Sequence, residues 1–216
     1  MNNSIKKAPA VSVVLAEYNR ADYLNRCMDS LLKQSFTDWE LIAIDDGSTD
    51  NSFDVLYSYS QKYPNIRVFR QDNMKLPLTR NKGIRESSGR YITFLDSDDE
   101  YEIDHLKCRV EYMEENPQVD LLSGGVKIIG NEYVRDKDNL KEFIHLSKCV
   151  IGATFFGKRI VFELLNGFKN IAYSEDSEFW QRASSLFNTV RVDYPTYIYH
   201  REVSDSITNS LSAQMD

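Results

Sequence analysis

Short apolar runs that alternate with helical segments constrain the fold of this chain more than any other feature. Each run is too short for a buried helix, and the first is rich in β-branched valine, as expected of a strand buried on both faces. Between the first two runs, apolar residues recur at helical spacing from Leu24 to Leu32. This alternation predicts an α/β fold with a mostly parallel central sheet and helices on both faces. The runs are 11–16, 39–44, 66–69 and 91–95.

The sequence that follows these runs is less regular. A helical segment near 104–115 leads to apolar runs at 119–122 and 126–129, which two glycines separate. We expect mixed strand direction here, because the regular strand–helix alternation ends. The polar stretch 131–139 is typical of an exposed loop, and a further amphipathic helix is predicted to begin near Ser174.

Length bounds the number of domains. A chain of 216 residues fits one large domain, and its sequence contains no internal repeat. We expect a flexible segment over 1–10 and a single domain over 11–216. The domain divides into a regular half, 11–101, and a more variable half, 102–216.

Charge and cysteine content exclude several classes of protein. Lys and Arg number 26 and Asp and Glu 33, which gives a net charge of −7, so we expect no nucleic-acid partner. The three cysteines are far apart and odd in number, which predicts no disulfide framework and favours a reducing, cytoplasmic location. No apolar run is long enough to span a membrane, and peripheral contact with the inner face of a membrane stays open.

Two carboxylates follow the apolar run at 91–95. Asp96 and Asp98 stand directly after this predicted strand. Mg²⁺ and Mn²⁺ prefer such oxygen ligands, commonly one or two carboxylates together with substrate phosphates and water. The alternative is a solvated acidic turn, because short motifs of this kind recur by chance. The other motifs of the chain decide between the two interpretations.

A second acidic pair, Asp45 and Asp46, follows the run at 39–44. Gly47 permits a tight turn that presents the preceding carboxylate to a ligand, and a carboxylate there can accept the imide N–H of uracil. The alternative is a capped turn, in which Asp and Ser48 bond the backbone of the next helix. Ligands of parallel sheets bind beyond the carboxyl ends of the strands, which is where both acidic pairs are expected.

Four motifs in a fixed order carry a resemblance to a known family. They are E-Y-N-R at 17–20, D-D-G-S at 45–48, L-T-R-N-K-G at 78–83 and L-D-S-D-D at 95–99. With them, the first half resembles a family-2 glycosyltransferase of the GT-A fold, a Rossmann-like sandwich. The resemblance implies a metal-dependent, inverting enzyme that moves a sugar from a nucleoside diphosphate sugar, expected to be a UDP-sugar, to an acceptor hydroxyl.

The resemblance also implies roles for residues of the nucleotide pocket. Tyr18 and Asp46 would contact the base, and an aromatic ring can stack on one. Asp45 and Arg80 would support the pocket, where Arg80 offers a fork of donors to phosphate or carboxylate. The donor half of the proposed enzyme would therefore lie within 11–101.

The same resemblance implies Mn²⁺ or Mg²⁺ at Asp96 and Asp98, with Asp96 also meeting the donor ribose. GT-A enzymes often add a histidine near the carboxyl terminus, and His200 lies in that region, before the segment 206–208. In relatives this histidine often lies closer to that segment, near Val203. His200 is therefore a candidate metal ligand whose register stays open.

The second half contains a candidate catalytic base. Ser174, Glu175 and Asp176 precede an aromatic pair and resemble the E-D motif of the family, in which the Asp is the base. The alternative is structural, because acids in the first turn of a helix are favourable by a few tenths to about 1 kcal/mol. We take Asp176 as the catalytic residue, and we leave Glu175 open between the two roles.

Three departures from the family pattern are visible. Glu17 stands where relatives have proline, and the glycine often found before the R-N pair is missing from 74–78. Both departures bear on the shape of the donor pocket. The Q-x-x-R-W signature of processive members is also absent, which argues against a chain-polymerising synthase and favours a non-processive enzyme.

Two other functions stay open at the level of the sequence. A sugar-phosphate nucleotidyltransferase would more naturally carry a glycine-rich loop after the first strand, and 17–20 contains no glycine. A nucleotide-sugar-binding protein without turnover would keep the donor motifs. The acceptor of the enzyme would be a glycan, a lipid-linked glycan, a polysaccharide of the cell envelope or a protein. The segment 131–139 is a candidate acceptor-side loop.

Overall fold

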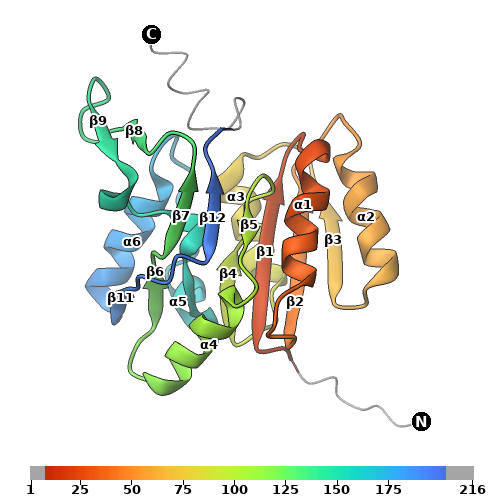
Figure 1. The fold of residues 1–216 in the computed structure, drawn as a ribbon, viewed down its shortest axis with the longest axis horizontal. Helices are drawn as coiled ribbons and strands as arrows, with labels where there is room; N and C mark the ends of the chain where they lie inside the picture. Colours follow the sequence, from red (N-terminus) through yellow and green to blue (C-terminus); the bar gives the residue numbers. More distant parts are fainter. Residues whose placement is uncertain (1–7, 203–216) are drawn as a thin grey trace.

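The computed structural model describes residues 8–202. Most of the expected flexible segment, together with Val203 and the segment 206–208, lies outside the described residues. A seven-stranded sheet with the order β11-β6-β10-β4-β1-β2-β3 forms the centre of the molecule (Figure 1). Its strands are β1 (Val11–Glu17), β2 (Trp39–Asp45), β3 (Ile66–Arg70), β4 (Tyr91–Phe94), β6 (Leu121–Ser123), β10 (Phe156–Lys158) and β11 (Thr189–Arg191).

Parallel pairing of β1 to β4 builds the part of the sheet that the apolar runs predict. β1 pairs in parallel with β2, from Val11 opposite Trp39 to Glu17 opposite Asp45. It pairs in parallel with β4 on its other side, and β2 pairs in parallel with β3. Every residue of β1 and β2 is buried, as expected of strands with helices on both faces. The prediction of an α/β fold with a mostly parallel central sheet is confirmed.

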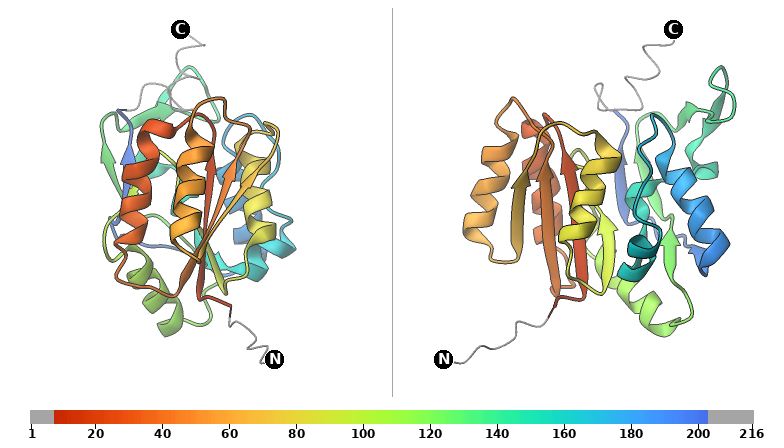
Figure 2. Two further views of the ribbon diagram at one scale, coloured as in Figure 1. Left: turned by 90° about the vertical axis from the view of Figure 1, so that its right-hand side faces the viewer. Right: turned by 180° about the vertical axis from the view of Figure 1, so that it is seen from behind.

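Helices cover the two faces of the sheet in separate groups (Figures 1 and 2). In one hydrophobic core, α1 (Ala21–Leu32), α2 (Ser52–Lys62) and α4 (His105–Glu115) pack against one face of the sheet. In the other core, α3 (Leu76–Glu86), α5 (Arg159–Leu164) and α6 (Glu175–Leu186) pack against the opposite face. Val13 and Val14 of β1 enter different cores, because successive side chains of a strand point to opposite faces.

The second half joins the central sheet through an antiparallel strand. β10 pairs antiparallel with β4 and with β6, whereas β11 pairs in parallel with β6. The prediction of mixed strand direction is therefore confirmed. Two 3₁₀ turns, η1 (Leu146–Lys148) and η2 (Gly152–Thr154), lead into β10, and no helix within residues 8–202 is long and apolar enough to cross a membrane.

Two smaller sheets complete the second half. One has the order β5-β12-β7, and the other is a hairpin of β8 and β9. The prediction of a loop over 131–139 is wrong for part of this stretch, because Val134 turns inward and its strand pairs antiparallel with β9. The strands are β5 (Glu100–Tyr101), β7 (Val126–Ile129), β8 (Tyr133–Arg135), β9 (Phe143–His145) and β12 (Tyr197–His200).

Candidate functional site

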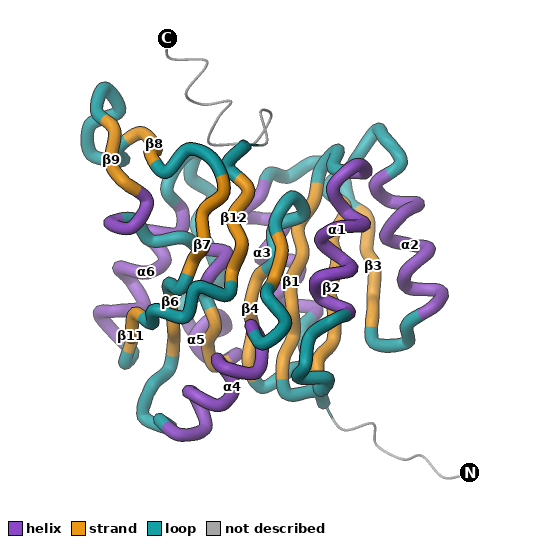
Figure 3. The backbone as a smooth tube through the Cα atoms, in the orientation of Figure 1, coloured by secondary structure: helices purple, strands orange, loops and turns teal. Residues whose placement is uncertain are grey.

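The predicted site residues of the first half gather at one edge of the sheet. β1, β2 and β4 are parallel and end at the same edge, the upper one in Figure 3. Tyr18 follows β1, Asp46 follows β2, and Asp96 follows β4 by two residues. Tyr18 is half exposed there, with 45% of its surface open to solvent. The parallel register thus brings together residues that lie far apart in the sequence.

Asp45 and Asp46 are both buried, and each organises a turn. Asp45 accepts a hydrogen bond from the Ser48 N–H (3.0 Å) and lies 3.0 Å from Nε of Arg70. Asp46 accepts from Nε2 of Gln71 at 2.7 Å and from two peptide N–H groups of the segment before α3, both at 2.9 Å. Asp45 therefore closes its own turn and does not cap α2, which begins at Ser52, and Asp46 fastens the segment that leads to α3.

Lys75, in the segment where a glycine is expected before the R-N pair, adopts a backbone conformation that is typical of glycine. Its backbone has φ 72° and ψ 159°, a combination that residues other than glycine rarely adopt. The Lys75 N–H donates to Oδ2 of Asp46 at 2.9 Å. The turn that glycine usually makes is thus made by a lysine, and the Asp46 carboxylate holds it in place.

Glu17 replaces the proline of relatives with a buried carboxyl group. Only 3% of its surface is exposed, and its two oxygens each lie 3.3 Å from Oγ of Ser48. Burial and the adjacent Asp45 raise the pKa of Glu17 to about 9. Glu17 is therefore protonated at neutral pH, and it brings no charge to this edge of the sheet.

Arg80 connects the two halves of the molecule. Its guanidinium is buried, with Nη2 2.7 Å from Oδ1 of Asp96 and Nη1 3.4 Å from Oε1 of Glu175. The same group lies 5.6 Å from the ring centroids of Phe94 and Phe168. Burial alone would lower the pKa of Arg80, but Asp96 and Glu175 raise it above its ordinary value. Asp96, which follows β4, and Glu175 of the E-D motif thus both pair with Arg80.

The segment 96–99, which we call the acid loop, holds its carboxylates in different environments. The side chains of Asp96 and Asp98 are 28% and 16% exposed, whereas Asp99 is fully buried. Oδ2 of Asp98 lies 3.7 Å from Nε of Arg20. Asp99 accepts from the Tyr197 hydroxyl at 2.7 Å and from the His200 N–H at 2.8 Å. Sequence reasoning assigned no role to Asp99, whose only signal is its place at the end of the acidic run.

His200 is engaged by two carboxylates. Its Nε2 lies 2.8 Å from Oε1 of Glu100, and its Nδ1 lies 2.6 Å from Oε1 of Glu202. Within residues 8–202 no group of three or more His, Cys, Asp or Glu side chains is arranged to hold a metal. Asp96 and Asp98 nevertheless fit Mn²⁺ or Mg²⁺, because both present oxygen ligands to solvent and such ions take further ligands from phosphate and water.

Asp176 is partly buried at the start of α6, next to Arg80. Its Oδ2 accepts from the Gly152 N–H at 3.1 Å and its Oδ1 from the Ser177 N–H at 2.6 Å. Burial, followed by the charge of Glu175, raises the pKa of Asp176 to about 6. The carboxylate can therefore exchange a proton near neutral pH, as a general base must.

Backbone strain accompanies three of the predicted site segments. Among residues 8–202, four residues other than glycine have positive φ, and three of them are Asn19, Lys75 and Ser174. They stand next to Tyr18, before α3 and directly before Glu175, respectively. Such conformations cost on the order of 1–3 kcal/mol each and cluster at functional sites.

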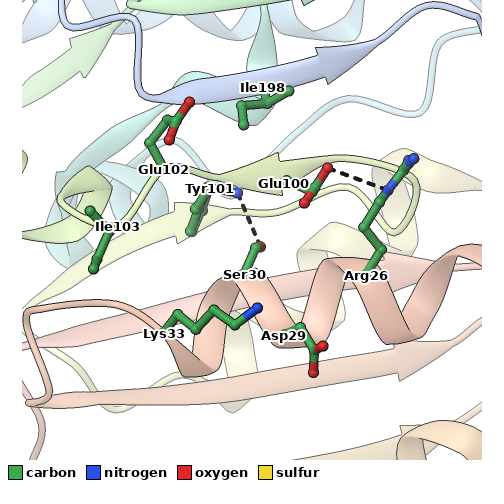
Figure 4. Close-up of a pocket in the computed structure, with 9 residues that line it drawn as sticks. All are labelled: Arg26, Asp29, Ser30, Lys33, Glu100, Tyr101, Glu102, Ile103 and Ile198. Atoms are coloured by element: carbon green, nitrogen blue, oxygen red, sulfur yellow. Dashed lines mark hydrogen bonds and ion pairs between the residues drawn. The ribbon is translucent and has the colours of Figure 1, made fainter.

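A groove of about 630 Å³ lies on the α1 face, beside the acid loop (Figure 4). Arg26 and Ser30 of α1 form one wall, and residues 100–103 form much of the other. Arg26 lies 3.5 Å from Glu100, and the Tyr101 N–H donates to Oγ of Ser30 at 3.0 Å. None of the predicted site residues lines this groove, although Arg26 and Glu100 of its walls contact Asp98 and His200.

Comparison with known families agrees with this arrangement. The model of glycosyl transferase family 2 matches residues 12–173. The chain belongs to glycosyl transferase family 2. A family-2 relative from Bacillus subtilis, the putative teichuronic acid biosynthesis glycosyltransferase TuaG, is 40% identical over 108 residues, which cover 50% of this chain and 43% of TuaG. The chain spans less than half the length of the first curated relatives it matches.

Solved structures of other glycosyltransferases share the fold. Staphylococcus aureus TarS in complex with UDP has a TM-score of 0.72 at 20% identity, over 88% of this chain and 60% of the TarS chain. The mannosyltransferase PcManGT from Pyrobaculum calidifontis, in complex with GDP-Man and Mn²⁺, has a TM-score of 0.70 at 20% identity, over 89% and 57% of the two chains. The predicted family and its sandwich fold are thus confirmed.

Proposed function

We propose that this family-2 chain transfers a sugar from a nucleoside diphosphate sugar, a UDP-sugar, to an acceptor hydroxyl. The observation that carries the proposal is the position of Arg80, which contacts Asp96 of the acid loop and Glu175 beside Asp176. These contacts support the proposal that the donor acids and the base belong to one site. The nucleotide complexes of TarS and PcManGT support a nucleotide-sugar donor.

In this proposal Tyr18, Asp45, Asp46 and Arg80 form the donor pocket. Tyr18 is exposed enough to stack on the base. A carboxylate has about four acceptor positions, and three donors already reach Asp46. One position is left to accept the imide N–H of uracil. Asp45 supports the pocket through its turn.

Asp96 and Asp98 would hold Mn²⁺ or Mg²⁺ together with the donor diphosphate, with His200 as a further candidate ligand. When bound, the ion supplies Lewis-acid stabilisation of the charge that grows on the departing diphosphate, worth several kcal/mol. The Mn²⁺ in the PcManGT complex supports a divalent ion. Arg80 lies beside Asp96 and adds a fixed positive charge near the same place.

Asp176 would take the proton of the acceptor hydroxyl as that oxygen attacks the anomeric carbon. The carbon–oxygen bond to the diphosphate breaks in the same step, so that the anomeric centre inverts. With a pKa of about 6, the Asp176 carboxylate is mostly ionised at neutral pH and is ready to act as a base. The two peptide N–H groups from Gly152 and Ser177 orient it.

The acceptor that we propose is a polysaccharide or lipid-linked glycan of the cell envelope. The naming of TuaG as a teichuronic acid biosynthesis glycosyltransferase supports this class. We place the enzyme in the cytoplasm, at the inner face of the membrane, in agreement with the reducing location that its three widely spaced cysteines favour. The β8–β9 hairpin is the candidate acceptor-side element, because the Tyr173 hydroxyl, three residues before Asp176, donates to the Arg135 carbonyl at 2.6 Å.

Calorimetric titration of UDP and of GDP, each with and without Mn²⁺, tests the donor half of this proposal. We expect wild-type protein to bind UDP more tightly with Mn²⁺, and Asp98→Ala to lose at least about tenfold of that metal-dependent affinity. Thermal unfolding should change little, because the Asp98 side chain lies on a partly exposed loop. Failure of both nucleotides to bind the wild-type protein would refute the proposed function.

A further inference from the structure

The hydroxyl group of Tyr197 lies between the two ends of the acid loop. It accepts a hydrogen bond from the Asp96 N–H at 3.2 Å and donates one to Oδ2 of Asp99 at 2.7 Å. Asp98 stands between these two residues. A single side chain from β12, about a hundred residues away along the sequence, therefore fixes the segment that carries the proposed metal ligands.

Asp99 depends on the hydrogen bond that Tyr197 donates. It is fully buried, and its second oxygen accepts from the His200 N–H at 2.8 Å, also on β12. A buried carboxyl group that loses a hydrogen-bond donor retains the cost of its desolvation. The position of Asp99 is thus tied to β12, and a turn in which the Asp99 N–H donates to the Asp96 carbonyl at 3.0 Å carries that restraint to the rest of the loop.

Tyr197 is itself fixed by packing that does not involve the acid loop. None of its surface is exposed. Its ring meets those of Tyr101 and His105 edge-on, with centroids 5.7 and 5.9 Å away, and its N–H donates to the Gly125 carbonyl. The position of the hydroxyl is therefore set by β12 and by its contacts with Tyr101, His105 and Gly125.

We propose that Tyr197 and Asp99 are positioning residues, which hold Asp98 in the geometry that binds the diphosphate and its divalent ion. This inference rests on the proposed function, and it assigns neither residue a contact with the donor. Groups that orient a metal ligand typically contribute about 10–100-fold to metal affinity or activity. The second half of the chain thus shapes the donor site as well as supplying the base.

Titration of UDP with and without Mn²⁺ on Tyr197→Phe tests this inference. The phenylalanine keeps the ring packing and removes only the hydroxyl. We expect the enhancement of UDP affinity by Mn²⁺ to fall about tenfold or more, while metal-free UDP binding stays unchanged. If Tyr197→Phe is poorly folded, Asp99→Asn replaces it as the test variant, because it keeps the size of the side chain. We expect it to lower the enhancement of UDP affinity by Mn²⁺ as well.

Tyr101→Phe is the matched control. Tyr101 is buried in the same cluster, and its hydroxyl donates to the Phe94 carbonyl at 2.6 Å without contacting the acid loop. We expect it to lose thermal stability much as Tyr197→Phe does and to keep the full Mn²⁺ enhancement. Equal loss of enhancement in both variants, or full enhancement in Tyr197→Phe, would overturn the inference. Wild-type protein that binds neither UDP nor GDP would instead overturn the proposed function and the inference with it.

Discussion

Three acids of the first half and the candidate base of the second half are held in different ways. In the first half Asp45, Asp96 and Asp98 each lie within ion-pair distance of an arginine, at 3.0, 2.7 and 3.7 Å. In the second half Asp176 accepts two peptide N–H groups and lies beside Glu175, and burial with that neighbour raises its pKa to about 6. The ion pairs hold the three acids of the first half in place for binding, whereas a carboxylate with a raised pKa can take up and release a proton near neutral pH. The two halves are thus suited to donor binding and to proton transfer.

Asp176→Asn should give the largest effect, because it should abolish proton transfer and leave donor binding intact. Loss of a general base typically costs about 10²–10⁴-fold in rate, so release of UDP from a UDP-sugar should fall by that amount while UDP affinity is retained. The measurement pairs a UDP-release assay with calorimetry. Glu178→Gln, a charge-matched change on the same helix, serves as the control and should keep its activity. A parallel loss of UDP affinity in Asp176→Asn would contradict the division between the halves.

Gly152→Ala should disturb the base without removing it. A Cβ atom at this position would lie 2.9 Å from Cβ of Asp176 and 3.2 Å from Nη1 of Arg80, so Asp176 must shift. A misplacement of about 1 Å can cost about 10²-fold in rate. We expect UDP release to fall far more than UDP affinity in the same assays. An unchanged rate would show that the Asp176 geometry tolerates the shift.

The rate and the stability of the wild-type protein should both depend on pH through the ionisation of Asp176. The rate should rise about tenfold per pH unit below pH 6 and level off above it, as Asp176 ionises. Because the folded pKa lies above the ordinary value of 3.8, the folded state binds more protons between about pH 4 and 6. Stability should therefore fall as pH rises through this window, by on the order of 3 kcal/mol for this group.

Urea unfolding across that pH range measures the effect on stability. Asp176→Asn should lose this component of the pH dependence, because the amide does not titrate. A slope that is identical in wild type and variant would assign the pH dependence to another group, such as the buried Asp99, whose pKa is also raised by burial and by its acidic neighbours.

Lys75→Gly should give the smallest effect, and it changes only the first half of the molecule. Glycine adopts φ 72° without the strain that lysine bears, and relief of such strain is worth about 1 kcal/mol. The variant should therefore be more stable in urea unfolding, with an unchanged rate of UDP release per bound donor. Lower stability would mean that the lysine side chain stabilises the folded protein by more than its backbone costs.

The regular half of the fold was predictable because its signals are local. The apolar runs at 11–16 and 39–44 are long enough to show burial on both faces, and both became the fully buried strands β1 and β2. In the second half β8 and β10 contain three residues each, too few for a periodicity to show. Their pairing is decided by partners far along the chain, as for β10 between β4 and β6.

The candidate site was predictable for residue types and less so for contacts. Asp96, Asp98 and Asp176 could be singled out because the motifs that contain them resemble those of the family. The ion pairs of Arg80 with Asp96 and Glu175, and the bond from Tyr197 to Asp99, span 16 to 98 residues. No local pattern predicts such contacts, because they depend on how distant elements pack.

The antiparallel strand β10 has a consequence for how the chain is made. β4 pairs with β1 on one side and with β10 on the other, and β10 is synthesised only after α4 and several further elements. A ribosome that adds about 5–20 residues per second leaves one edge of β4 without its partner for several seconds. Exposed strand edges invite pairing with other chains. The nascent first half is therefore most vulnerable to aggregation in the interval before β10 emerges.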